Sequence, residues 1–197
     1  MARNFCFDER FYREYYIDPR TRVMGPEDYR RLGNFVCSYL KYMDQPVRRV
    51  LDIGCGLGRW RAVLRRHFPH ACYTGVEISE YACRRYGWER GSVVDYRARR
   101  PFDLVICQAV LQYLTGREAQ AALGNLARLC RGALYLDVMT REDWGEDCAR
   151  ASVDGDVYLR SGSWYRRRLV RHFVNAGGGV FVRRSAPATL FDLEQLK

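Results

Sequence analysis

Short apolar runs rich in β-branched residues recur along this chain, at intervals that leave room for a helix between them. Runs of this kind are typical of strands that are buried on both faces of a parallel sheet. The pattern predicts strands at 47–53, 72–78, 91–95, 102–107, 133–138, 180–182 and 188–193.

The segments between these runs carry apolar residues at every third or fourth position, which predicts amphipathic helices. One helix is expected to begin at Pro26, because a proline followed by Glu27 and Asp28 is a typical N-terminal signature. Strands that alternate with helices predict an α/β fold with a mostly parallel sheet. Further helices are expected from about residue 59, at 117–131 and at 164–175, the last one ended by the three glycines at 177–179.

The segment from Val50 to Trp60 carries the strongest local signal. An apolar strand ends there, and the spacing Gly-x-Gly-x-Gly over 54–58 turns the chain sharply into a helix. Glycines in such a turn permit positive φ and let a ligand lie against the backbone. Free N–H groups at the start of the next helix then face that ligand, so the segment predicts a nucleotide-type site.

Two departures separate this turn from the dinucleotide-binding pattern Gly-x-Gly-x-x-Gly/Ala. The third glycine, Gly58, comes one position early, and Arg59 stands where the pattern needs a small residue. Asp52, at the end of the strand, would also repel a pyrophosphate. A ligand that lacks phosphate and has a positive end fits both departures, and S-adenosylmethionine is such a ligand because it carries sulfonium and α-ammonium groups.

The stretch Asp52-Ile53-Gly54-Cys55-Gly56-Leu57-Gly58 resembles the first motif of the class I S-adenosylmethionine-dependent methyltransferases. The next three predicted strands add elements in the order and spacing of that family, since they end at Glu77, Asp95 and Cys107-Gln108. The resemblance implies a Rossmann-like three-layer sandwich whose seven-stranded sheet is mostly parallel, with an antiparallel strand near the C-terminus.

The length of the chain suits one domain with a single substantial core. We expect one methyltransferase domain over 1–197, with an N-terminal helical cap segment at 1–45 and a cofactor-binding core at 46–197.

The resemblance also implies the cofactor-binding residues. Asp52 would hold the ammonium end of S-adenosylmethionine, Glu77 would accept hydrogen bonds from the ribose hydroxyls, and Asp95 would accept from the adenine amino group. Ile78 would lie against the adenine, and S-adenosylhomocysteine would be the product. The full expected set is Asp52, Gly54, Cys55, Gly56, Gly58, Glu77, Ile78, Asp95, Tyr96, Cys107 and Gln108.

The methyl acceptor is expected on the open side of the cofactor, near Gln108, Gln112, Tyr113, Met139 and Trp144. Methyl transfer from a sulfonium is an in-line displacement, so the main task of the protein is to align the nucleophile with the methyl group. Gln108 and Tyr113 are the candidate catalytic residues. Related small-molecule enzymes often have a pair of histidines where this chain has Gln112-Tyr113, so the resemblance assigns no general base.

Two signatures of other acceptors are absent from the sequence. The Asn/Asp-Pro-Pro-aromatic signature of enzymes that methylate amide or exocyclic nitrogen does not follow the fourth strand. The catalytic cysteine motif of the RNA methylases that modify pyrimidine carbon is not visible either. A small-molecule acceptor, which can be anionic, is therefore favoured.

Residues 1–25 carry a cluster of aromatic side chains. Packing in the core explains such a cluster at least as well as a function does. In the resembling family, an N-terminal segment often folds over the cofactor, which would bring the phenol of Tyr12 or Tyr16 to the acceptor pocket. Three of the rings are spaced four residues apart on one helical face and two lie beside them: Phe7, Phe11 and Tyr15, with Tyr12 and Tyr16.

The formal net charge of +10 raises the question of a nucleic-acid partner. Of the 33 basic residues, all except Lys41 and Lys197 are arginines, and these are spread along the whole chain. Because a nucleic-acid surface would concentrate its charge on one element, a nucleic-acid partner is less favoured than a small molecule.

The eight cysteines stand singly, without a Cys-x-x-Cys pair, which favours free thiols over disulfides or a metal site. His67 and His70 do not share a helical face, because Pro69 lies between them, so no metal is expected there either. No apolar run reaches the roughly 20 residues of a membrane span, and no signal peptide is visible. We therefore expect a cytoplasmic protein without membrane contact, and the oligomeric state stays open.

Three other functions remain as alternatives. An RNA or protein side-chain methyltransferase would suit the arginine content and would show salt-sensitive RNA binding. A catalytically silent, cofactor-binding regulator would keep the fold, although the intact set of Asp52, Glu77 and Asp95 argues against it. A nicotinamide-dependent oxidoreductase is disfavoured by the glycine spacing and by Asp52.

Overall fold

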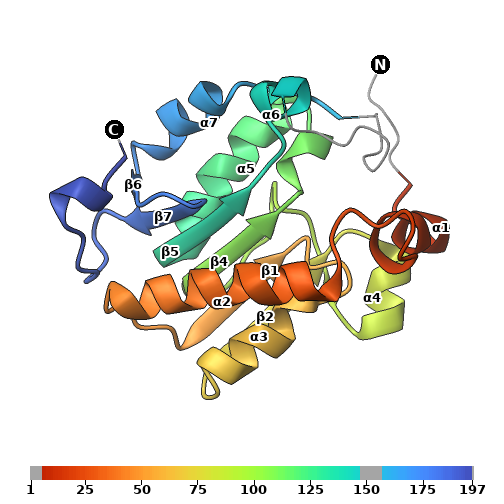
Figure 1. Cartoon of the computed structure of the whole chain (residues 1–197), viewed down its shortest axis with the longest axis horizontal. Helices are drawn as coiled ribbons and strands as arrows, with labels where there is room; N and C mark the ends of the chain where they lie inside the picture. The colour runs from red at the N-terminus through yellow and green to blue at the C-terminus, as the bar shows by residue number, and fades with distance from the viewer. Residues whose placement is uncertain (1–5, 147–156, 197) are drawn as a thin grey trace.

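The computed structural model describes residues 6–146 and 157–196. Within these residues a seven-stranded sheet forms the central layer, and helices pack against it (Figure 1). The strands are β1 (Arg49–Ile53), β2 (Cys72–Glu77), β3 (Glu89–Arg90), β4 (Phe102–Gln108), β5 (Cys130–Asp137), β6 (Phe173–Asn175) and β7 (Val180–Arg183). The helices are α1 (Glu9–Tyr12), α2 (Pro26–Tyr42), α3 (Arg59–His67), α4 (Glu80–Tyr86), α5 (Gly116–Leu129), α6 (Arg141–Glu146) and α7 (Gly162–Leu169). Shorter turns are the π-helical η1 (Arg13–Ile17) and the 3-10 helices η2 (Leu111–Tyr113) and η4 (Asp192–Glu194).

The strand order in the sheet is β3-β2-β1-β4-β5-β7-β6. Strands β1 to β5 pair in parallel, whereas β7 is antiparallel to both β5 and β6. The predicted fold, with one antiparallel strand near the C-terminus, is confirmed. The order reverses between β1 and β4, and ligands of open α/β sheets bind outside the carboxyl ends of the strands at such a point.

Both faces of the sheet are buried. On one face, Leu51 and Val105 pack in a cluster that includes residues of α5 and α7. On the other face, Val50 and Leu104 pack in a cluster with residues of α2 and α3. This two-sided burial explains why β1 and β4 are continuous apolar runs in the sequence. It also places α2, although it lies within residues 1–45, in a core layer of the fold.

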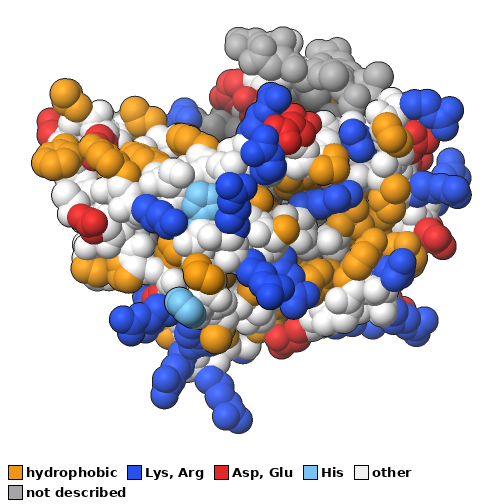
Figure 2. Space-filling model, turned by 60° about the horizontal axis from the view of Figure 1, so that its bottom comes forward, with side chains coloured by type: hydrophobic (Ala, Val, Ile, Leu, Met, Phe, Trp, Pro, Cys, Tyr) orange, Lys and Arg blue, Asp and Glu red, His pale blue; other side chains and the backbone are white. Residues whose placement is uncertain are grey.

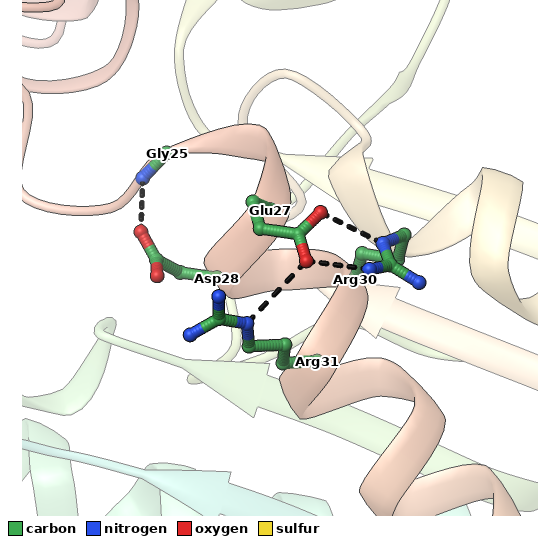
Figure 3. A network of polar contacts seen from close by, with 5 residues as sticks. All are labelled: Gly25, Glu27, Asp28, Arg30 and Arg31. Carbon is green, nitrogen blue, oxygen red and sulfur yellow. Dashed lines mark hydrogen bonds and ion pairs between the residues drawn. The ribbon is translucent and has the colours of Figure 1, made fainter.

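The start of α2 is fixed by a group of polar contacts (Figure 3). The N–H of Gly25 donates to the carboxylate of Asp28 at 2.8 Å, and Pro26 occupies the first turn. Glu27 accepts from Nε of Arg30 at 2.8 Å, and from Arg31 one turn later. These contacts satisfy the N–H of Gly25 and place acids at the positive end of the helix, so the predicted N-terminus of α2 is confirmed.

The third strand was expected at 91–95, and this expectation is wrong. Strand β3 is only Glu89–Arg90, and the chain turns at 93–95. Val93 is buried in the core, and the side-chain amide of Asn125 on α5 donates to its carbonyl at 2.9 Å. The apolar residues of this run therefore pack in the core from a turn. No neighbouring strand is needed to pair this carbonyl, because the side chain of Asn125 on α5 already donates a hydrogen bond to it.

The expectations for the C-terminal region are partly wrong. The helix expected at 164–175 ends at Leu169, and Phe173–Asn175 forms β6 instead. The glycines at 177–179 all have positive φ and join β6 to β7 as a hairpin, where the sequence suggested that they end a helix. The strand expected at 188–193 is absent from the described residues, since that segment is irregular and ends in η4.

Among the described residues, no helix is long and apolar enough to cross a membrane. Figure 2 shows that Lys and Arg side chains are scattered over the visible face, with acidic and apolar groups between them.

Candidate active site

A cavity of about 370 Å³ opens at the carboxyl ends of β1, β2 and β4. Small-molecule sites commonly have volumes of roughly 300–1,000 Å³. The walls come from the glycine turn after β1, the segments that follow β2, β3 and β4, the first turn of α2 and the segment around α1. The cavity therefore lies at the point where the strand order reverses, as expected for a ligand site of this fold.

The glycine turn is held in one shape from two sides. Gly54, Gly56 and Gly58 have φ of 75°, 50° and 69°, a region that side chains rarely adopt. A Cβ on Gly54 would lie 2.3 Å from Cγ2 of Val110, and one on Gly58 would lie 2.4 Å from the ring of Trp88. The indole N–H of Trp88 also donates to the carbonyl of Gly56 at 2.9 Å. Residues 54–57 of this turn line the cavity.

Asp52, the last residue but one of β1, lines the cavity and is only 2% exposed. Its Oδ2 accepts a hydrogen bond from the hydroxyl of Tyr73 on β2 at 2.6 Å. Burial, helped by the negative charge of Glu77, raises the pKa of Asp52 to about 7, against the lowering effect of the Tyr73 hydrogen bond. A carboxylate in such a place is stabilised by any cation that enters the cavity.

Glu77 ends β2, lines the same cavity and is 4% exposed. Its Oε2 accepts from the N–H of Gly56 at 2.8 Å, and its Oε1 accepts from the N–H groups of Ile78 and Ser79 at 2.7 and 2.9 Å. A carboxylate has about four lone-pair sites, so these three bonds leave one site for a ligand. Glu77 therefore ties the glycine turn to the end of β2 and keeps an acceptor position free.

The N-terminal aromatic cluster covers the cavity. The rings of Phe7, Phe11, Tyr12 and Tyr16 line it, and Tyr12 is only 3% exposed. The Phe7 ring meets that of Tyr113, from the loop after β4, edge-on with centroids 5.1 Å apart. The cluster thus packs against the site. Tyr15, which was expected to share a helical face with Phe7 and Phe11, does not line the cavity.

A model of the methyltransferase-domain family matches residues 51–132. This range contains the glycine turn, Asp52, Glu77 and the end of β4, which together form the floor of the cavity. The match assigns this range, which is less than half of the chain, to the methyltransferase-domain family. The resemblance of residues 52–58 to the first motif of that family is thereby confirmed.

Individual relatives resemble only part of this chain. A trans-aconitate 2-methyltransferase of Pseudomonas aeruginosa is 35% identical over 88 residues, which are 40% of this chain and 32% of the relative. A malonyl-[acyl-carrier protein] O-methyltransferase of Anoxybacillus flavithermus is 29% identical over 106 residues, 49% of this chain and 41% of the relative. The chain therefore spans well under half the length of these curated relatives.

Two solved structures share the fold over most of their length. Streptomyces venezuelae DesVI has a TM-score of 0.59 at 16% identity, over 79% of this chain and 91% of that protein. Magnesium protoporphyrin IX methyltransferase from Synechocystis, solved with bound S-adenosylmethionine, has a TM-score of 0.58 at 20% identity, over 87% of this chain and 89% of that protein.

The two candidate catalytic residues both line the cavity, in different environments. The side-chain oxygen of Gln108 accepts from the indole N–H of Trp60 at 2.8 Å, and its amide nitrogen donates to Asp137 at 3.2 Å. Ala109, the next residue, has a φ of 54° although it is not a glycine. Gln108 is therefore a fixed wall of the site, whereas Tyr113 contacts the aromatic cluster above it.

Several residues of the expected set do not line the cavity. Asp95 is exposed in the turn after β3, and Tyr96 beside it donates its hydroxyl to Glu89 at 2.9 Å. Gly58 lies behind the turn against Trp88, and Cys107 is buried within the core. The members that do line the cavity are Asp52, Gly54, Cys55, Gly56, Glu77, Ile78 and Gln108.

On the acceptor side, Gln108 and Tyr113 line the cavity, whereas Gln112, Met139 and Trp144 do not. Gln112 is a buried residue of η2, and its backbone carbonyl accepts from the N–H of Tyr158 at 2.7 Å. Part of the polar segment expected to serve as an acceptor loop, together with Cys148, lies outside the described residues.

Sequence reasoning missed several residues that line the cavity. Ser92 and Val93 lie there in place of Asp95, because the chain turns two residues earlier than expected. Tyr29 reaches the cavity from the first turn of α2, and Tyr158 reaches it from a segment far along the chain. Arg59 was singled out only as a departure from the dinucleotide pattern. Only Arg59 carries a local signal in the sequence, since the others are brought to the cavity by tertiary packing.

Proposed function

We propose that this chain transfers a methyl group from S-adenosylmethionine to a small-molecule acceptor by in-line displacement. The observation that carries the proposal is the cavity at the switch point of the sheet, with the buried Asp52, Glu77 and the glycine turn on its floor. The match of residues 51–132 to the methyltransferase-domain family supports the same reaction.

The residues present fit this cofactor. Asp52 is a buried carboxylate lining the cavity, which suits the ammonium of the amino-acid end. Glu77 keeps one acceptor position for a ribose hydroxyl, and Ile78 offers an apolar surface for the adenine. A Cβ on Gly56 would project toward the ring of Tyr12 at 3.4 Å, so the glycine keeps the passage between floor and lid open.

When bound, S-adenosylmethionine supplies a methyl group made electrophilic by a sulfonium. The chain contributes mainly orientation and exclusion of water. Phe7, Phe11 and Tyr113 form an apolar cover, which strengthens the electrostatic interactions inside the cavity. Gln108 is held by Trp60 and Asp137, so it is a rigid wall against which an acceptor can be positioned.

We propose further that the acceptor presents an ionised oxygen, with a small carboxylic acid as the first candidate class. The cavity suits such a nucleophile, because no histidine is among the described residues that line it and a carboxylate has no proton to lose at neutral pH. Two relatives are named for trans-aconitate and a malonyl thioester, both of which carry carboxylates. Tyr16, Tyr113 and Tyr158 line the cavity, and a tyrosine hydroxyl is a group that can donate to an anion.

Calorimetry with S-adenosylmethionine, S-adenosylhomocysteine and nicotinamide dinucleotides tests the cofactor. The two adenosyl ligands should bind and raise the unfolding free energy by about 2.7 kcal/mol at a hundredfold excess over Kd, and the dinucleotides should not. Glu77→Gln should weaken S-adenosylhomocysteine binding about tenfold, because one acceptor oxygen of the carboxylate becomes a donor. The matched control is Glu80→Gln on the exposed surface of α4.

Transfer of a labelled methyl group to panels of carboxylic acids, amines, thiols and RNA then tests the acceptor. Labelling confined to the acids supports the acceptor class, whereas labelling confined to amines, thiols or RNA overturns it. Absence of binding by either adenosyl ligand would overturn the whole proposal.

A further inference from the structure

Arg59 is the first residue of α3 and lines the cavity. Its side chain is half-buried, yet it takes part in none of the ion pairs found within residues 6–146 and 157–196. Other arginines of the chain, such as Arg30 and Arg131, are paired with carboxylates. A partly desolvated guanidinium without such a partner is suited to a carboxylate ligand, because its planar fork matches the two oxygens.

The charges that line the cavity are unequal in number. Among the described lining residues, Asp52, Glu77 and Glu118 are acidic, and Arg59 is the only cation. A ligand that complements this set carries positive charge together with one carboxylate. S-adenosylmethionine has this charge pattern, since it combines a sulfonium and an ammonium with the carboxylate of its amino-acid end.

Asp52 and Arg59 flank the glycine turn, at the end of β1 and the start of α3. They form no ion pair with each other. Both charges act on the phenol of Tyr29, which lines the cavity from the first turn of α2. One end of the cavity therefore presents a negative group, a positive group and a hydroxyl donor in the same neighbourhood.

We propose that Arg59 binds the carboxylate at the amino-acid end of the cofactor, so that Asp52 and Arg59 together recognise a zwitterion. An amino acid carries its ammonium and carboxylate on one carbon atom, which matches two opposite charges on either side of one turn. The hydroxyl of Tyr29 can donate to the same carboxylate. The inference rests on the proposed function, because it assumes that S-adenosylmethionine occupies the cavity.

The test measures the affinities of three ligands by calorimetry. S-adenosylmethionine has both groups of the amino-acid end, decarboxylated S-adenosylmethionine has only the ammonium, and 5′-methylthioadenosine has neither. The wild type should bind S-adenosylmethionine about ten- to hundredfold more tightly than its decarboxylated form. Arg59→Met should remove this preference, leave the affinity for 5′-methylthioadenosine unchanged, and be partly rescued by Arg59→Lys.

Arg61→Met is the matched control, because Arg61 is an exposed arginine of the same helix whose guanidinium lies 6.0 Å from the Trp88 ring. Unchanged 5′-methylthioadenosine binding in Arg59→Met also shows that the variant is folded. If the preference for the carboxylate survives in Arg59→Met, the inference is overturned while the proposed function stands. The inference is likewise overturned, and the proposed function stands, if Arg59→Met alters only the KM of the acceptor. If the wild type binds none of the three ligands, the proposed function itself fails.

Discussion

Asp52 should make the stability of the free protein depend on pH in an unusual direction. Its pKa is raised by burial to about 7, against an ordinary value of 3.8 for the same group exposed to water. The folded state therefore binds more protons than the unfolded state between these values, and stability falls as pH rises from about 4 to about 7. Because the pKa differs by about three between the two states, the unfolding free energy should fall by an amount on the order of 4 kcal/mol over this range.

The substitution Asp52→Asn tests this reasoning. Asparagine has no charge to desolvate, and its oxygen can still accept the hydrogen bond from Tyr73. Above pH 7, the variant should be more stable than the wild type by up to about 4 kcal/mol, which raises the Tm by roughly 8–16 °C in a chain of this size. Denaturant unfolding at several values between pH 4 and 8 measures the difference, with Asp192→Asn on the exposed surface as the control.

The same carboxylate should couple ligand binding to pH. The ionised fraction of Asp52 rises from about a tenth at pH 6 to about nine tenths at pH 8, so S-adenosylhomocysteine should bind about tenfold more tightly at the higher pH. Asp52→Asn should bind S-adenosylhomocysteine weakly at both pH values. A stability difference between wild type and variant that stays constant from pH 4 to 8 would refute the reasoning, because Asp52 would then titrate alike in both states.

Two further predictions concern the walls of the cavity. Gly54→Ala should lower the unfolding free energy by at least about 2 kcal/mol, because the alanine would have a strained positive φ and would also clash with Val110. Adding Val110→Ala to this variant should recover only the part that is due to the clash. Full recovery in a denaturant titration would contradict the strain argument. Arg160→Met should lower the unfolding free energy by about 3 kcal/mol and weaken S-adenosylhomocysteine binding, because the buried guanidinium donates to the carbonyls of Leu111, Leu114 and Tyr158 around η2. Arg160→Lys should recover part of both losses. Binding and stability equal to those of the wild type would show that η2 does not depend on Arg160.

Local signals were sufficient for the first half of the fold. Continuous apolar runs predicted β1, β2 and β4, because each of these strands is buried by helices on both faces of the sheet. Proline and acids predicted the start of α2, because the free N–H groups there need acceptors within the same turn. These features are decided within a few residues, so the sequence alone suffices for them.

Other elements depended on partners that are distant in the sequence. The run 91–95 has the pattern of a strand, yet Asn125 on α5 satisfies its backbone and leaves it a turn, so that Ser92 and Val93 line the cavity in place of Asp95. Phe173–Asn175 has helical neighbours in the sequence, but it pairs with β7 through a hairpin of glycines with positive φ. In both cases tertiary pairing outweighed the local pattern.

By itself, the sequence determined the α/β class, the ligand turn and the two acids Asp52 and Glu77, because a strand end and a glycine turn position these groups locally. Only the tertiary structure decided that Tyr29, Arg59, Tyr113 and Tyr158, together with the aromatic rings near α1, surround the same cavity. Their spacing in the sequence carries no such information. They meet because the strand order reverses between β1 and β4, and packing on the two faces of the sheet brings separate loops over that edge.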